Sequence, residues 1–317
     1  MGLSLFLLGF VLYFIDLRMF WKTIRTADTG FLLIAILLFF PVQLLAAYRW
    51  YFVLGRLNKF IPFRSILCHS MLGQLSTFFL PGQISGDVVR FLAVGHGQAG
   101  KATLALSVIV DKIALLFALA TFALAGTLAP GPVSQFITIH IAAVGTITLL
   151  LPILFCLCQY RSEQIPNWLI QTADRVPHLR SYVLVNLEEC LTLPRISVQS
   201  SFVVLVLGLL LLFFYTVGAY FIARSMQIVI NPIDWVAINA IVSLAQILPL
   251  TLGGLGVREG AFSVLLALYA IPLTQAVAFS LTGFVLAVVL TACCWVVLNT
   301  LRRMKDVARG NNEPVHQ

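Results

Sequence analysis

Two short glycine-rich segments place arginine and carboxylate side chains inside apolar sequence. The segments are LPGQISGDVVR at 80–90 and TLGGLGVREGAF at 251–262. Arginine recognises phosphate through a fork of N–H donors, and an ionisable residue inside a membrane segment usually marks a binding site or a transport pathway. We therefore expect the two segments to form a binding site for an anionic group.

In the first segment, Asp87 and Arg90 are three residues apart. On a helix they share one face and can form an ion pair. Two interpretations are open: the pair neutralises itself and fixes the turn, or it contacts the headgroup of a lipid. Because a charge at the bilayer centre costs about 2.5–3.5 kcal/mol on insertion scales, several such charges indicate a wet cavity or mutual pairing.

In the second segment, Arg258 and Glu259 are adjacent and cannot face each other on a helix. Each is expected to have another partner, and a charge of the first segment is the natural one. Gly253, Gly254 and Gly256 come directly before them. Backbone N–H groups exposed at a helix start would suit a lipid phosphate, whereas close helix packing through small residues is the alternative.

A third charged pair, Asp111 and Lys112, lies within the apolar stretch 101–128. Buried this deep, ionisable side chains are expected to have a partner or a function. Three roles are open for them: binding the substrate, relaying protons, or pairing with Arg90 or Arg258.

The two halves of the chain repeat one pattern at an offset of 170 residues, which relates Pro62 to Pro232 and Gly86 to Gly256. The same offset relates two polar ladders with i, i+4, i+7 spacing, which are His69, Gly73 and Ser76 in the first half and Asn239, Ser243 and Gln246 in the second. A single polar side chain of this kind is typical of an interhelical hydrogen bond, but together they predict a polar track along a cavity. Matching broken, charged segments in repeated halves point to a transport site at the repeat interface.

The composition places these features in a membrane protein. Of the 317 residues, 60% are hydrophobic and 10% are charged, and the mean hydropathy is +1.00. Soluble domains have about 45–50% apolar and about 25% charged residues. The apolar runs are long and continuous, which favours helices over a β-barrel. We predict an all-α polytopic protein with a single membrane domain at 1–303.

About six transmembrane helices and two re-entrant broken hairpins are expected. The predicted spans are 2–15, 30–55, 101–128, 136–158, 199–223 and 273–301, and the hairpins are 63–95 and 233–271. The first span is shorter than the roughly 20 residues that cross the hydrocarbon, and it lacks the features of a removed signal peptide.

The distribution of Lys and Arg predicts the orientation. With both termini in the cytoplasm, thirteen cations fall on the cytoplasmic side and four on the far side. The cytoplasmic set is Arg49, Arg56, Lys59, Arg64, Lys101, Arg161, Arg175, Arg180, Arg195, Arg302, Arg303, Lys305 and Arg309, and the far set is Arg18, Lys22, Arg25 and Arg224. The halves 1–128 and 136–301 then form an inverted repeat. Hairpin helices that each cross fully give the same count, so both arrangements stay open.

Four stretches resemble a known family: Arg49–Trp50, FLPGQISGDVVR, SVIVDK at 107–112 and LGGLGVREGAF. They are similar to the flippase-like transmembrane domain of lysylphosphatidylglycerol synthases, as found in stand-alone members without the synthase. The resemblance implies a multi-pass protein of a bacterial or archaeal cytoplasmic membrane that moves lipid headgroups between leaflets. The chain departs from the family where Lys112 replaces a common arginine, and it has no soluble aminoacyl-transfer domain.

Several other functions are not expected. GHGQAGK at 95–101 resembles a P-loop, but Ala102 stands where the metal-binding Ser or Thr belongs. The six cysteines and five histidines have no metal-ligand spacing, so we expect neither a metal nor a cofactor. The net charge of +8 lies at span ends, where it meets anionic lipid rather than nucleic acid. The sequence offers no Ser/His/Asp set placed for catalysis, so an enzyme is not expected.

Two polar segments complete the organisation. An apolar stripe at 160–195 predicts an amphipathic helix on the cytoplasmic surface, formed by Ile165, Trp168, Leu169, Thr172 and Val176. The segment 304–317 is expected to be a disordered tail.

The sequence thus predicts a flippase or transporter for a phospholipid or a lipid-linked anionic headgroup. The alternative is a lipid-binding accessory protein, without transport, for a separate membrane synthase or glycosyltransferase. Expected partners are membrane lipids with anionic headgroups, and a second copy of the chain or a membrane enzyme is compatible with the same features.

Overall fold

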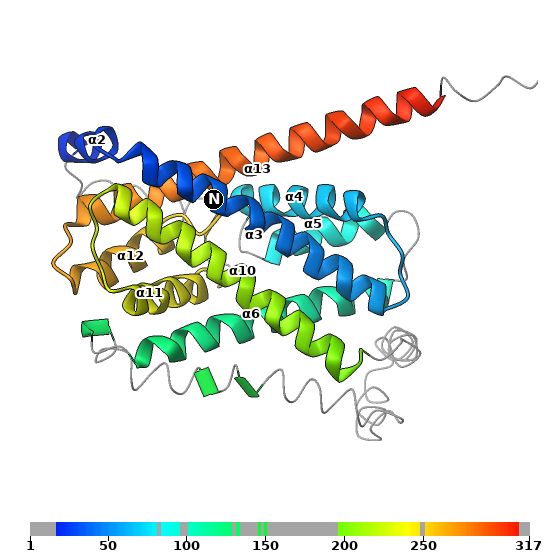
Figure 1. The fold of residues 1–317 in the computed structure, drawn as a ribbon, viewed down its shortest axis with the longest axis horizontal. Coiled ribbons are helices and arrows are strands. Elements are labelled where there is room, and N and C mark those ends of the chain that lie inside the picture. The colour runs from blue at the N-terminus through cyan, green and yellow to red at the C-terminus, as the bar shows by residue number, and fades with distance from the viewer. Residues whose placement is uncertain are drawn as a thin grey trace, which may run out of the picture.

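The computed structural model describes residues 17–80, 84–95, 101–128, 131–133, 145–146, 149–150, 196–247 and 251–310. The elements in this part of the chain are α-helices, as predicted (Figure 1). They are α2 (Leu17–Arg25), α3 (Thr29–Arg56), α4 (Phe63–Phe79), α5 (Ile84–Gly95), α6 (Lys101–Thr127), α10 (Val198–Ser225), α11 (Pro232–Ala245), α12 (Val257–Ala267) and α13 (Leu273–Gly310).

Four helices are long and apolar enough to cross a membrane: α3, α6, α10 and α13. Because a helix rises about 1.5 Å per residue, their apolar stretches of 25–29 residues exceed the roughly 30 Å of hydrocarbon. They confirm four of the six predicted spans. The other two, at 2–15 and 136–158, lie outside the described residues except at four positions of the second.

The same succession of long and short helices occurs twice along the described part of the chain. Both α3 to α6 and α10 to α13 consist of a long helix, two short helices and a long helix. The first helices of the two units, α3 and α10, lie side by side and antiparallel (Figure 1). The backbone N–H of Asp28, at the start of α3, donates to the carbonyl oxygen of Ser225, at the end of α10, over 2.9 Å.

The short helices form two pairs, α4–α5 and α11–α12, that lie toward opposite ends of α3 (Figure 1). The four helices have 17, 12, 14 and 11 residues. The link between α11 and α12 abuts the end of α4, because a Cβ atom on Gly253 would lie 2.9 Å from the carbonyl oxygen of Phe78. Gly253 itself has a φ of +58°, which L side chains rarely adopt. The tips of the two pairs therefore meet.

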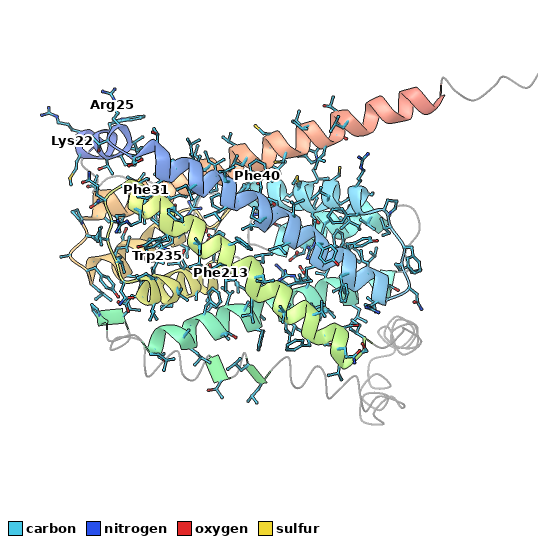
Figure 2. All side chains as sticks on the ribbon, in the orientation of Figure 1. Lys22, Arg25, Phe31, Phe40, Phe213 and Trp235 are labelled. Atoms are coloured by element: carbon cyan, nitrogen blue, oxygen red, sulfur yellow. The ribbon has the colours of Figure 1, made fainter. Side chains whose placement is uncertain are left out.

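The largest group of buried apolar residues lies between α3, α6, α10, α11, α12 and α13. Trp235 of α11 belongs to this group (Figure 2), and its ring contacts those of Tyr220, Phe262 and Phe279 on α10, α12 and α13. Its indole Nε1 donates to the carbonyl oxygen of Thr216 over 3.2 Å, which fixes α11 against α10. This packing positions the second pair of short helices.

Helices α4 and α5 are packed backbone to backbone at Gly73 and Gly86. A Cβ atom on Gly73 would lie 2.6 Å from the carbonyl oxygen of Gly86. We expect Gly73→Ala to lower the free energy of unfolding by about 1–3 kcal/mol, because rigid backbone cannot move aside. The unfolding temperature in detergent measures this. Gly55→Ala is the matched control, since a Cβ there meets nothing within 4 Å, and an unchanged temperature in both would contradict the packing.

The predicted disordered tail at 304–317 is wrong in its first part. Helix α13 continues to Gly310, because the segment RRMKDVAR is composed largely of good helix formers. The remainder of the tail and the amphipathic segment at 160–195 lie outside the described residues.

Candidate functional site

One cavity of about 300 Å³ lies between the two units. Eight helices line it, α3 to α6 and α10 to α13. Its charged lining residues in the described part of the chain are Arg49, Asp87, Arg90, Asp111, Lys112 and Arg258. Its polar lining includes Gln43, Ser70, Gln74, Thr77, Asn239, Ser243, Gln246 and Ser280. Arg90 and Arg258, one from each glycine-rich segment, therefore face the same space.

A chain of ion pairs crosses the first unit. Arg90 Nη2 donates to Asp111 Oδ2 over 2.7 Å and to Asp87 Oδ1 over 2.8 Å. Arg49 Nε donates to the other oxygen of Asp111 over 2.6 Å, and Lys112 Nζ lies 2.7 Å from Asp87 Oδ2. The two carboxylates therefore join three cations from α3, α5 and α6.

This network is buried by aromatic packing. Arg49, Asp87, Arg90 and Asp111 are each no more than 8% exposed. The guanidinium of Arg90 lies over the ring of Trp50, with 4.8 Å between its Cζ and the ring centroid. A cation over an indole face is stabilised by the ring quadrupole, more strongly where water is excluded.

The helical spacing predicted the Asp87–Arg90 pair, and the structure contains it. Of the alternatives open for Asp111, pairing with Arg90 is present; Lys112 pairs with Asp87, a partner that the sequence did not suggest.

Arg49 is the residue that sequence reasoning placed wrongly. It was counted with the cytoplasmic cations, but it is 4% exposed and paired with Asp111 inside the protein. The sequence does indicate that Arg49 is buried, because position 49 lies within the predicted span 30–55, and helix α3 continues to Arg56. A cation seven residues before the end of a membrane-spanning helix lies inside the membrane or the protein unless the helix extends beyond the membrane surface.

The second charged group lies at the start of α12. Arg258 Nε donates to Glu259 Oε1 over 3.1 Å and to Ser280 Oγ over 2.9 Å, and Ser280 donates in turn to Glu259 over 3.0 Å. The Arg258 guanidinium lies over Phe284, at 4.8 Å from the ring centroid. Glu259 is completely buried.

The prediction that Arg258 and Glu259 need separate partners is wrong. The Glu259 side chain folds back over the first turn of α12, where its Oε2 accepts from the backbone N–H of Gly256 over 2.6 Å. This hydrogen bond, which is half of a capping box, brings the other carboxylate oxygen beside Arg258. A pairing of Arg258 or Glu259 with Asp87 or Arg90 is not what the structure contains.

The glycines before α12 form a turn, and Gly253 also packs closely against α4, which is the second of the two roles predicted for these glycines. Gly253, Gly254 and Gly256 have φ values of +58°, +75° and +87°, so they provide a turn that other residues would strain. The N–H of Gly256 is occupied by Glu259, so the protein's own carboxylate takes a place that was predicted for a lipid phosphate.

The two polar ladders have different outcomes. Asn239, Ser243 and Gln246 of α11 line the cavity. On α4, Gly73 lines it, but His69 and Ser76 do not; Ser70, Gln74 and Thr77 take their place. The close contact between α4 and α5 sets the rotation of α4, and this rotation turns the neighbouring helical face toward the cavity.

Several polar atoms at this cavity are buried and have no hydrogen-bond partner among the described residues. They are Arg49 Nη1, Arg90 Nε, Ser70 Oγ, Asn239 Oδ1 and Asp87 Oδ2, and the last of these lies 2.7 Å from the ammonium group of Lys112 as an ion pair. Unsatisfied buried polar atoms are uncommon, and each costs about 1–3 kcal/mol when left unpaired. Two of them belong to guanidinium groups, whose N–H donors match the oxygens of a phosphate or carboxylate. Within the described residues, no cluster of three His, Cys, Asp or Glu side chains is placed to hold a metal ion.

A family model matches nearly the whole chain. The family model for the lysylphosphatidylglycerol synthase TM region matches residues 1–294. No curated protein matches the chain.

Proposed function

The chain belongs to the family of the lysylphosphatidylglycerol synthase TM region, and we propose that it moves a phospholipid or a lipid-linked anionic headgroup between the leaflets of a membrane. The observation that carries this proposal is the cavity between the two helical units, with arginines from both units in its wall. An anion inside hydrocarbon needs such donors, because it leaves its hydrating water behind.

The exterior of the long helices suits a lipid whose acyl chains stay outside. Apolar side chains are exposed along α3, α10 and α13, for example Leu37, Phe213 and Val285. The cavity of about 300 Å³ is at the lower end of the range for ligand sites, about 300–1,000 Å³. In the proposed mechanism, only the headgroup enters it, while the acyl chains remain in the bilayer.

The arrangement of the two units supports alternating access. Helices α3 and α10 hold equivalent places in the two units and run antiparallel, and the two pairs of short helices lie toward opposite ends of them (Figure 1). We infer an inverted repeat with re-entrant pairs whose tips meet at the cavity. Rocking of one unit against the other would then expose the site to each leaflet in turn.

The charges at the two ends of the molecule support the proposed orientation. Lys22 and Arg25 of α2 project from the end where α3 begins (Figure 2). Arg56, Lys59 and Arg64 lie where α3 ends and α4 begins. Because Arg49 is buried, the number of Lys and Arg residues assigned to the cytoplasmic side falls from thirteen to twelve, against four on the far side. The asymmetry therefore remains, and we propose a bacterial or archaeal cytoplasmic membrane with both termini in the cytoplasm.

Reconstitution into liposomes tests the proposed function. Purified protein in vesicles with a fluorescent phosphatidylglycerol should expose the inner-leaflet label to a membrane-impermeant quencher, whereas empty vesicles should not. We expect Arg90→Ala to abolish the exchange, because the phosphate loses its donor in the cavity. The matched control is Arg56→Ala, whose guanidinium is exposed and lies over the ring of Phe52 rather than in the cavity.

Two other outcomes would contradict transport. Saturable binding of the lipid without exchange would favour the non-transporting accessory protein. A changed lipid product, detected by mass spectrometry of the vesicles, would indicate an enzyme.

A further inference from the structure

We propose that the lipid headgroup handled by the cavity is a polyol, such as a glycerol or inositol, and that two matched stripes of uncharged polar side chains recognise its hydroxyl groups. The inference rests on the proposed function and specifies its substrate, because it concerns the part of the headgroup beyond the phosphate. It follows from the position, exposure and hydrogen-bonding capacity of lining residues on α4 and α11.

Each stripe occupies one face of the first short helix of its unit. The polar lining residues stand eight, twelve and fifteen positions after the helix N-cap, which is Pro62 for α4 and Asn231 for α11. The α4 stripe is Ser70, Gln74 and Thr77, and the α11 stripe is Asn239, Ser243 and, at the C-cap, Gln246. The spacing i, i+4, i+7 keeps three side chains on one helix face. The two units therefore present equivalent uncharged polar surfaces to one space.

The repeat in the structure is shifted by one residue from the repeat in the sequence. The sequence offset of 170 pairs His69 with Asn239, but His69 does not line the cavity. Counting from the N-caps pairs Ser70 with Asn239 instead. In this register a polar lining residue of one unit matches a polar lining residue of the other at all three positions.

The last two members of each stripe keep accessible surface. Gln74 is exposed, and Thr77, Ser243 and Gln246 are half-buried. The Thr77 hydroxyl donates to the carbonyl oxygen of Gln74, and Gln246 Nε2 donates to that of Val242, so both side chains keep oxygen lone pairs as acceptors. A hydroxyl group can donate to such acceptors, whereas an ionised phosphate has no proton to donate. The stripes therefore suit the polyol part of a headgroup better than its phosphate.

The charged groups at the cavity are paired with one another. Three buried arginines oppose three buried carboxylates, namely Arg49, Arg90 and Arg258 against Asp87, Asp111 and Glu259. Lys112, whose side chain is 31% exposed, is a second cation beside Asp87. Since each of these carboxylates already contacts a cation, none of them is free to hold the ammonium of a zwitterionic headgroup. Among the described residues, the wall thus favours an uncharged polar group beyond the phosphate.

Two lipids of equal charge that differ only in hydroxyl groups test the inference. Phosphatidylglycerol carries two hydroxyl groups beyond its phosphate, and phosphatidylpropanol has the same charge and carbon chain without them. After subtraction of the exchange in empty vesicles, wild-type protein should exchange fluorescent phosphatidylglycerol at least about fivefold faster. That factor corresponds to one neutral hydrogen bond of average net strength.

Replacing one accessible residue of each stripe should reduce this preference. In the double variant Gln74→Met/Ser243→Ala, we expect the ratio of the two exchange rates to fall toward one. The ratio is the readout, because a replacement that only loosened the helices would slow both lipids alike. Ser76→Ala is the matched control: Ser76 Oγ donates to the carbonyl oxygen of Leu72 and does not line the cavity, so the wild-type ratio should remain.

The comparison of lipids with wild-type protein stays decisive if the double variant does not fold. Equal exchange of both lipids by wild-type protein overturns the inference and leaves the proposed function intact. A wild-type ratio in the folded double variant overturns the role of the stripes. Uptake of labelled inositol by the same vesicles would show that the polyol is a soluble molecule rather than a headgroup. Exchange of neither lipid would instead reject the proposed function.

Discussion

Asp111→Ala is expected to destabilise the protein by about 3–5 kcal/mol, the usual cost of leaving a buried charge without its partner. Asp111 is 5% exposed and accepts from Arg49 over 2.6 Å and from Arg90 over 2.7 Å. Removing it leaves two buried guanidinium groups close together without the carboxylate that both of them contact. The loss is measured as a lower unfolding temperature of the purified protein in detergent.

A double variant distinguishes the effect of an unpaired buried charge on stability from the effect of the missing side-chain volume. Arg49→Met/Asp111→Leu removes one charge of each sign and fills the space with apolar atoms, while Arg90 keeps Asp87 at 2.8 Å. Buried ion pairs replaced by apolar residues are often as stable as the original. We expect this variant to recover most of the unfolding temperature. A wild-type temperature for Asp111→Ala alone would show that water reaches the site and that the network is not buried in solution.

Arg258→Ala is expected to lower the rate of lipid exchange by a larger factor than any other single replacement in the second unit. Arg258 lines the cavity, and it neutralises Glu259, which is completely buried. Without the guanidinium, the negative charge of Glu259 would have no cation beside it and would repel the anion that the cavity is proposed to admit. Truncating one partner of a buried charge pair costs about 2–5 kcal/mol, which predicts at least a tenfold fall in the initial rate of exchange.

The fold is expected to survive this replacement better than that of Asp111. Glu259 keeps the backbone N–H of Gly256 and the hydroxyl of Ser280 as donors, so its carboxylate is not left without partners. Arg258→Lys keeps the charge but cannot donate to Ser280 and Glu259 in the same forked geometry, so we expect an intermediate rate.

Arg224→Ala is the matched control for Arg258→Ala. Its guanidinium also lies over a phenylalanine ring, at 6.0 Å from the centroid of Phe31, but it is not in the cavity lining. Exchange should be unaffected. A wild-type rate for Arg258→Ala at equal protein content in the vesicles would exclude Arg258 from the transport path.

Both replacements probe one property of the site, which is that its carboxylates act as internal counterions. Asp111 and Asp87 hold the arginines in place before any substrate enters, and Glu259 does the same for Arg258. Preorganised donors of this kind bind an anion without the cost of first ordering long side chains. In the proposed transport cycle the anionic headgroup has to leave the site, and these carboxylates provide the anions that take its place.

The sequence by itself determined the class of protein and much of the local structure. Continuous apolar runs predicted α3, α6, α10 and α13, because a helix in hydrocarbon must satisfy its own backbone hydrogen bonds and show apolar side chains. The three-residue spacing of Asp87 and Arg90 predicted their ion pair, since neighbours on one helix face are fixed by helix geometry. The glycines before Arg258 predicted a break in the helix there.

Contacts between helices were decided only by the tertiary structure. The rotation and crossing of the helices decide three contacts. Arg49 reaches Asp111, Ser70 rather than His69 of α4 lines the cavity, and Gly253 packs against Phe78. Helical periodicity records which residues share a face, but an apolar helix in a membrane is apolar on most faces, so its sequence does not specify which face points inward. Close packing at a few small residues, such as Gly73 against Gly86, sets that rotation and with it the site.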